Sequence, residues 1–221
     1  YPEIRKRAVA ILESGNTDHH DLVRYEYIRR LGYYCTESSE HNAEYNNFFI
    51  KAKYPELIER YNIPLDEYPR RCINQIENWK KDREKYMHDD VTHTRTTEYA
   101  SYIMEAIVTD IPYKIGGNVI NNGLIPNLPA EACVEVACLV NKNGIQPCAQ
   151  KPLPLQLAAM NSAMIGVQLL TIEAAVTQKK ETIYQAAMLD PHTSSELSID
   201  EIIRLCDDLI EAHGSYLPKY H

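Results

Sequence analysis

The chain has 221 residues and a net charge of −8, and 44% of its residues are hydrophobic while 24% are charged. These values are those of an ordinary globular domain with enough length for a buried core, and they argue against disorder. Because the net charge is negative, the surface repels phosphate backbones, and we expect no nucleic-acid partner. We also find no run of about 18 apolar residues, so we expect no membrane-spanning segment.

The cysteines and the first residues bear on the cellular context. The six cysteines form no CxxC pair, and in a chain of this length we interpret them as reduced thiols of a cytoplasmic protein. The opening residues Tyr1-Pro2-Glu3 include no initiator Met and lead into no apolar signal-peptide core. We therefore expect the chain to start inside a longer polypeptide.

Apolar residues recur at helical spacing through most of the first 110 residues and predict four helices. Gly15-Asn16 ends the first helix and Gly32 breaks the second. A polar segment and a proline-containing loop separate the second helix from the third. The predicted ranges are 1–14, 18–31, 67–88 and 95–109.

The pattern changes over residues 113–141, where short apolar runs alternate with Gly and Pro and predict strands. The runs are Val119-Ile120, Leu124-Ile125 and Val134 through Val140. The sequence therefore predicts an α+β fold that is mainly helical with a small antiparallel β region.

The last third is expected to be helical again. Residues 155–177 are apolar around nearly the whole helix circumference, which predicts a central buried helix. A short helix over 181–189 follows. The final helix begins at Ser198, which with Glu201 forms a capping-box signature, and it ends at Gly214.

One polar segment, residues 36–45, concentrates chemistry-bearing side chains. It contains Glu37, Glu40, His41 and Tyr45 directly after the helix-breaking Gly32. Such a segment between apolar helices can deliver an acid, a base and hydrogen-bond donors to one cleft. The alternative is a capped surface turn in which Ser38 or Ser39 begins a helix and the acids favour its N-terminus.

A second candidate is the asparagine-rich ribbon over residues 117–129. Its carboxamides, among them Asn118 and Asn121, can hydrogen-bond sugar hydroxyls, although Asn and Gly also simply make turns. His88-Asp89-Asp90 with His93 is more typical of a loop of solvated charges than of a metal site. No GxGxxG or Walker loop is present, so no motif of this chain binds a nucleotide.

Several motifs follow one another along the chain in the order seen in a known enzyme family. They are Gly32 through His41 with Glu44-Tyr45, Glu98-Tyr99-Ala100-Ser101, Gly117-Asn118-Val119 with Asn127-Leu128-Pro129, Val134 through Val140, and Asp190-Pro191-His192-Thr193. Together they cover nearly the whole chain and resemble glycoside hydrolase family 4, closest to its α-galactosidase branch. The resemblance implies a C-terminal domain of the lactate-dehydrogenase-like kind over residues 1–221, with the dinucleotide-binding domain lying upstream.

The chemistry implied by this resemblance is oxidative. A bound NAD oxidises the sugar at C-3, a base removes the C-2 proton, and the glycosidic oxygen leaves by elimination. A divalent metal, usually Mn²⁺, holds the neighbouring oxygens. Because the family's dinucleotide motif and its Cys and His metal ligands precede this region, no residue of this chain is assigned to NAD or to the metal.

The resemblance implies roles for residues on the substrate side. The base is expected to be Tyr45, assisted by Glu40 five residues before it, with His41 and Glu37 as alternates. A tyrosine ordinarily titrates near 10, so this role needs a nearby cation. We expect Asn118 and Asn121 to contact the sugar or to fix its loop, and Arg95 to serve as a charge partner near the cleft.

The expected substrate is an α-galactoside, and the near alternatives are α-glucosides and α-galacturonosides. By itself the chain is expected to be inactive. A different class of function is a non-catalytic dimerisation module, in which the helices over 155–177 and 199–212 form the interface of a homo-oligomer.

Overall fold

The computed structural model describes residues 1–90, 92 and 94–221. The elements before residue 110 are α1 (Pro2–Glu13), α2 (Leu22–Arg30), α3 (Ser39–Glu44), α4 (Glu56–Arg60), α5 (Glu67–His88) and α6 (Ala100–Thr109). Those after it are β1 (Tyr113–Ile120), β2 (Cys133–Asn141), β3 (Gly144–Pro147), α7 (Leu155–Thr177), α8 (Lys180–Leu189), α9 (Pro191–Glu196), α10 (Ile199–His213) and the 3-10 helix η1 (Gly214–Tyr216).

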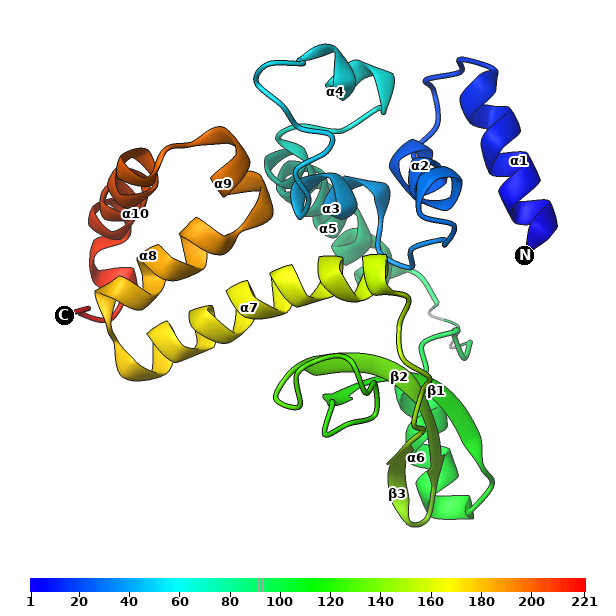
Figure 1. The fold of residues 1–221 in the computed structure, drawn as a ribbon. Helices are drawn as coiled ribbons and strands as arrows, with labels where there is room; N and C mark the ends of the chain where they lie inside the picture. Colours follow the sequence, from blue (N-terminus) through cyan, green and yellow to red (C-terminus); the bar gives the residue numbers. More distant parts are fainter. Residues whose placement is uncertain (91, 93) are drawn as a thin grey trace.

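The long helix α7 lies at the centre of this arrangement (Figure 1). The sheet and α6 lie on one side of it, the N-terminal helices on the other, and α8 to α10 fold back at its C-terminal end. Tyr184 of α8 donates a hydrogen bond of 2.6 Å to Asp207 of α10, and Lys180 pairs with the same carboxylate at 2.7 Å. These contacts tie the two helices together.

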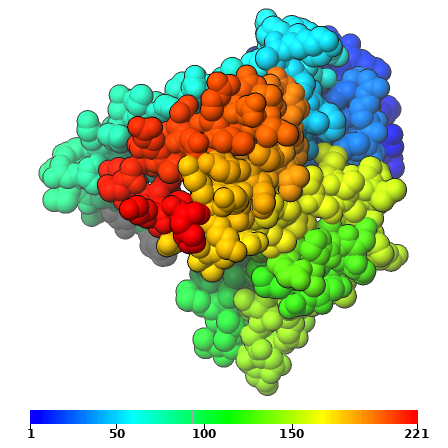
Figure 2. Space-filling view, turned by 60° about the vertical axis from the view of Figure 1, so that its left-hand side comes forward, coloured from blue at the N-terminus to red at the C-terminus, as the bar shows by residue number. Residues whose placement is uncertain are grey.

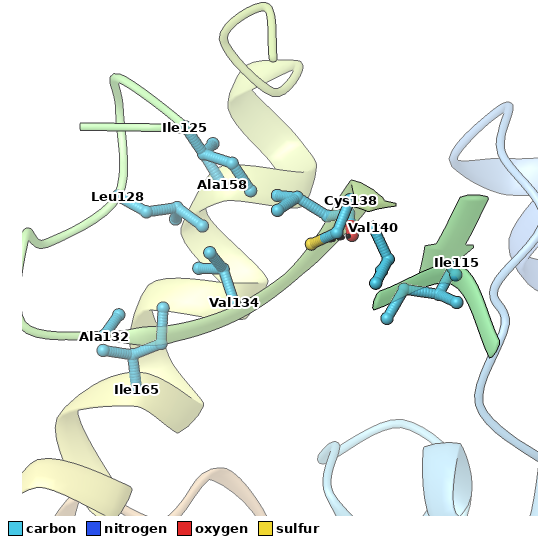
Figure 3. Close-up of a cluster of buried hydrophobic side chains, with 11 residues drawn as sticks. Ile115, Ile125, Leu128, Ala132, Val134, Cys138, Val140, Ala158 and Ile165 are labelled. Carbon is cyan, nitrogen blue, oxygen red and sulfur yellow. Dashed lines mark hydrogen bonds between the residues drawn. The ribbon is translucent and has the colours of Figure 1, made fainter. Parts of the chain in front are cut away.

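The sheet is antiparallel in the order β1-β2-β3, with Ile115 opposite Cys138. Alternate residues of β2, from Val134 to Val140, are buried, as expected of a strand with one face in the core. They pack with Ile165 of α7 in one hydrophobic cluster (Figure 3). A second cluster joins α2, α3 and the following loops, and Met160 of α7 packs against it. Helix α7 is therefore shared by both cores.

The predicted fold class is confirmed, as are the helices over 67–88 and 155–177 and the strand through Val134–Val140. The capping box is also present, since Ser198 accepts from the Glu201 backbone and the Glu201 carboxylate accepts in return. All six cysteines are free. The prediction of a strand at Leu124-Ile125 is wrong, because these residues lie in the loop between β1 and β2. The short helices α4 and α9 were not predicted.

The prediction that α7 is buried is also wrong. Only Ala158, Ile165 and Ala174 of its 23 residues are buried, although the helix carries few polar side chains. By length and composition it is apolar enough to cross a membrane, contrary to our expectation from the sequence, but core helices of soluble proteins have the same properties. Most of the apolar surface of α7 is therefore uncovered in this chain.

The total exposed surface of the chain is correspondingly large. The chain exposes 15549 Å², whereas a compact monomer of its mass exposes about 10,300 Å². Helix α5 contributes to the excess, because none of its 22 residues is buried. Figure 2 shows α5 and the sheet region projecting from the body.

Candidate active site

The four candidate residues from 37 to 45 lie on or beside α3. Ser38 is its N-cap, and the Ser38 hydroxyl accepts a hydrogen bond of 3.2 Å from the His41 backbone. The capped helix that we considered as the structural alternative is therefore present. This capped helix is compatible with a chemical role, because it places His41, Glu44 and Tyr45 in contact with one another.

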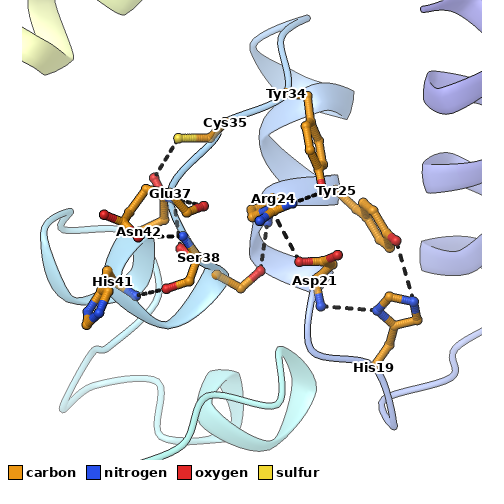
Figure 4. Close-up of polar contacts among 11 residues, drawn as sticks. His19, Asp21, Arg24, Tyr25, Tyr34, Cys35, Glu37, Ser38, His41 and Asn42 are labelled. Atoms are coloured by element: carbon orange, nitrogen blue, oxygen red, sulfur yellow. Dashed lines mark hydrogen bonds and ion pairs between the residues drawn. The ribbon is translucent and has the colours of Figure 1, made fainter. Parts of the chain in front are cut away.

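Asn42 is the buried residue that shapes this segment (Figure 4). Its amide donates to the carbonyls of Glu37 at 3.0 Å and Ser38 at 2.8 Å, and its side-chain oxygen accepts from the Cys35 thiol. Its own carbonyl accepts from the Tyr27 hydroxyl at 3.2 Å. These bonds close the chain between residues 35 and 42 into a turn fixed against α2.

Arg24 of α2 is a second anchor. Its backbone nitrogen donates to the Ser39 hydroxyl at 3.3 Å, which joins α2 to the first turn of α3. Its guanidinium lies 4.4 Å over the Tyr34 ring, donates to the Tyr34 hydroxyl, and pairs with Asp21 at 3.3 Å (Figure 4). The base of the segment is therefore held by charge and stacking as well as by the Asn42 amide.

His41, Glu44 and Tyr45 form a contiguous group. His41 Nδ1 lies 2.8 Å from Glu44 Oε2, and its ring stacks on that of Tyr45 at 5.8 Å between centroids. The hydrogen bond with Glu44 raises the pKa of His41. Partial burial raises the pKa of Tyr45, and the carboxylates of Glu37 and Glu44 raise it further. The chain itself thus favours a protonated phenol, opposite to what a tyrosine base requires.

Glu40 is placed differently from the sequence prediction. Its side chain is only 14% exposed and pairs at 3.0 Å with Arg71 of α5. The carboxylates whose charge acts on Tyr45 are those of Glu37 and Glu44. In this chain Glu40 thus contacts Arg71, and its assistance of Tyr45 stays a prediction.

The asparagine ribbon and Arg95 belong to the other side of α7. Asn121 is fully buried, and its amide donates to three loop carbonyls while its oxygen accepts from Ile125. Of the two roles expected for Asn121, burial leaves it no exposed surface for a sugar contact, and its hydrogen bonds fit the fixing of its loop. Asn118 is exposed on β1. Arg95 pairs with Glu105 of α6 at 2.7 Å and lies over the Tyr102 ring.

The described residues contain no cluster that could hold the implied metal. Among residues 1–90, 92 and 94–221, no three His, Cys, Asp or Glu side chains gather where they could bind a metal ion. His93, which we considered with His88 and the two aspartates, lies outside the described residues. The donor sets of this part of the chain thus form no site for Mn²⁺ by themselves.

Comparison with known proteins identifies the family. The model of the family 4 glycosyl hydrolase C-terminal domain matches residues 1–193. This chain belongs to glycoside hydrolase family 4. Among its family 4 relatives, an α-galactosidase of Bacillus subtilis (strain 168) is 58% identical over the whole chain. An α-galactosidase of Rhizobium meliloti (strain 1021) is 30% identical over 90% of the chain. The chain spans 50% and 43% of these two relatives.

Solved family 4 structures share the fold. A Bacillus subtilis protein described as a glucosidase, LplD, superposes with a TM-score of 0.80 at 20% identity, over 94% of this chain and 49% of its own. A 6-phospho-α-glucosidase from gut microorganisms, solved in complex with NAD and Mn²⁺, superposes with a TM-score of 0.71 at 16% identity, over 100% of this chain and 51% of its own.

Sequence reasoning missed three residues that the site geometry makes prominent. Glu44 was noted only as part of a motif, yet it is the partner of His41. Asn42 gave no sequence signal, because its role depends on how residues 35–46 fold. Arg71 gave none either, because its role depends on the position of α5 beside α3. The only sequence signal for the pairing of His41 with Glu44 was their separation of three residues, which places both on the same face of a helix.

Proposed function

We propose that this chain is the C-terminal, substrate-side part of an NAD- and Mn²⁺-dependent α-galactosidase of family 4. The observation that carries the proposal is the 58% identity, over all 221 residues, to an α-galactosidase of Bacillus subtilis. Relatives named for phosphorylated sugars are more distant than this one; a 6-phospho-α-glucosidase of Leptotrichia buccalis is 32% identical over 220 residues. The galactoside is therefore preferred over an α-glucoside or an α-galacturonoside.

The proposed reaction oxidises the sugar at C-3, eliminates the glycosidic oxygen across C-1 and C-2, adds water and restores the hydroxyl. NAD supplies the redox chemistry and Mn²⁺ the charge stabilisation, both held by sequence outside this chain. The chain's own part is to place a proton acceptor beside C-2. In isolation the chain is proposed to be inactive.

Tyr45 is the proposed acceptor. Its hydroxyl is held at the end of α3 by the stack on His41, and the pair of His41 with Glu44 keeps a charged hydrogen-bonded group beside it. Because the carboxylates of Glu37 and Glu44 favour the neutral phenol, a cation from outside this chain is needed to lower its pKa. His41 and Glu37 remain the alternate acceptors.

A chimera tests the proposal directly. The upstream half of the Bacillus subtilis relative is fused to this chain, and hydrolysis of p-nitrophenyl α-galactoside is measured with and without NAD and Mn²⁺. We expect turnover only when both are present, and none from the isolated chain. A soluble, folded chimera that cleaves no α-galactoside under these conditions contradicts the proposal.

Tyr45→Phe in the chimera tests the acceptor. A lost general base costs roughly 10²- to 10⁴-fold in kcat. Tyr54→Phe is the matched control, because Tyr54 and Tyr45 are exposed to similar extents, 45% and 42%. Equal kcat values for the two variants would transfer the role to His41 or Glu37.

Assembly with further copies of the chain is a second proposed role, supported by the uncovered apolar surface of α7. The α7 and α10 faces are the expected interface. Sedimentation over a range of protein concentrations tests it, and a monomer at the highest concentration contradicts it.

A further inference from the structure

Helix α9 contacts the segment that follows Tyr45, although the two lie far apart in the sequence. The Glu196 carboxylate at the end of α9 pairs with the Lys51 ammonium at 2.6 Å and accepts a hydrogen bond of 3.0 Å from the Ala52 backbone, 144 residues away. Lys51 also donates to the Ser195 hydroxyl at 3.0 Å. The side chains of Lys51 and Glu196 are each only 20% exposed. Both carboxylate oxygens are therefore engaged in a contact that is partly shielded from water.

The short helix α9 holds this carboxylate in place. Asp190 is its N-cap and accepts a hydrogen bond of 2.7 Å from the Thr193 backbone, while Pro191 occupies the first helical position. The N-cap of α10, Ser198, follows shortly after Glu196. The motif from Asp190 to Thr193, which has no part in the proposed chemistry, thus fixes a carboxylate between two capped helices. Figure 1 shows α9 on the side of the C-terminal helices that faces α3.

The segment that receives this contact depends on side chains for its shape. Residues 46–50 form bends that belong to no helix or strand. At their start, the Asn46 amide donates to the Asn42 carbonyl at 3.0 Å, and in the middle Phe49 is buried in the hydrophobic cluster around α2 and α3. The carboxylate of α9 supplies the third attachment, at the end of the segment. The chain that leaves α3 at Tyr45 is therefore fixed at three places.

We propose that Glu196 is a positioning residue for the reaction, because its bonds to Lys51 and Ala52 fix the segment after α3 and so the place of the Tyr45 hydroxyl. This inference rests on the proposed role of Tyr45 as the proton acceptor. Hydrogen bonds from the Lys51 ammonium and the Ala52 amide lower the pKa of Glu196, so the carboxylate is charged at neutral pH. A displacement of about 1 Å at a reacting group costs up to about 10²-fold in rate, so the attachment matters for turnover.

Hydrogen exchange in the chimera tests the attachment without any assay of activity. In Glu196→Ala, we expect the peptide over residues 46–53 to exchange on the order of tenfold faster, and the peptide over α10 to stay unchanged. Glu181→Ala is the matched control, because it removes an exposed carboxylate from the neighbouring helix α8. Glu196→Gln keeps an oxygen for the Ala52 amide, and it answers the same question if Glu196→Ala is insoluble. Unchanged exchange over residues 46–53 overturns the proposal.

Kinetics of the chimera on p-nitrophenyl α-galactoside test whether the attachment acts through Tyr45. We expect Glu196→Ala to lower kcat by about tenfold to a hundredfold with little change in KM, and Glu181→Ala to leave both unchanged. In the Tyr45→Phe background, Glu196→Ala should lower kcat no further, since the group that it positions is gone.

A contact that only ties α9 to the rest of the fold gives a different result. In that case Glu196→Ala lowers kcat equally in both backgrounds, and the positioning role is refuted. The same conclusion follows if exchange over residues 46–53 is faster but kcat matches that of Glu181→Ala. If the unmodified chimera is inactive, the proposed function fails, and the exchange result alone then decides whether Glu196 fixes the segment.

Discussion

The buried amide of Asn121 allows a quantitative test of how the loop after β1 is held. In Asn121→Ala, the carbonyls of Ile125 and Pro129 keep backbone partners, Leu128 and Ala132 respectively. The Ile125 N–H and the Leu128 carbonyl lose the side-chain partner that bound them at 2.7 and 3.0 Å. Each buried group left without a partner costs about 2 kcal/mol, so the variant should lose about 4 kcal/mol of unfolding free energy.

Urea unfolding followed by circular dichroism measures this loss as a lower midpoint at unchanged slope. Asn118→Ala is the matched control, because Asn118 is exposed on the neighbouring strand, and its stability should change by less than about 0.5 kcal/mol. An Asn121→Ala variant within about 1 kcal/mol of the wild type would refute this reasoning. It would mean that the loop keeps its shape without the amide.

Two further predictions concern the candidate site and the sheet. Glu44→Gln should bring the pKa of His41 down toward the ordinary value near 6.5, as measured by NMR titration of the imidazole; an unchanged His41 pKa would mean that Glu44 is not its partner. Because folding raises the His41 pKa, the stabilisation from this pair is full below the unfolded-state pKa and is lost as the pH rises through the folded-state value. Gly117→Ala should destabilise by about 1–3 kcal/mol in urea unfolding, since the added Cβ would lie 2.7 Å from the Cys138 sulfur. Gly116→Ala meets only the flexible end of a glutamate and should cost less; the reverse order would contradict the packing at β1.

The sequence was most informative where a local pattern decides the structure. Ser198 and Glu201 form the capping box that their spacing predicts, because both partners lie within one helical turn. The strand through Val134 was predictable for a similar reason, since alternating burial follows from a period of two. The order of the predicted helices and strands indicated the α+β fold class, and the family resemblance agreed with it.

The features that could not be predicted depend on contacts between segments that are distant in the sequence. Nothing local distinguishes Asn121, a buried structural amide, from Asn118, which is exposed on the same ribbon. Glu40 has the spacing of an assistant to Tyr45, but α5 brings Arg71 to it instead. The exposure of α7 could not be predicted either, because an apolar composition does not tell whether residues of the same chain pack over the helix.

The central claim is that C-2 of an α-galactoside loses its proton to a group on this chain. The most direct measurement is the hydrolysis of an α-galactoside by the chimera in D₂O, with NAD and Mn²⁺, followed by NMR of the product. If a base removes the C-2 proton and solvent replaces it, the released galactose carries deuterium at C-2. Galactose released with its C-2 proton fully retained would contradict the account.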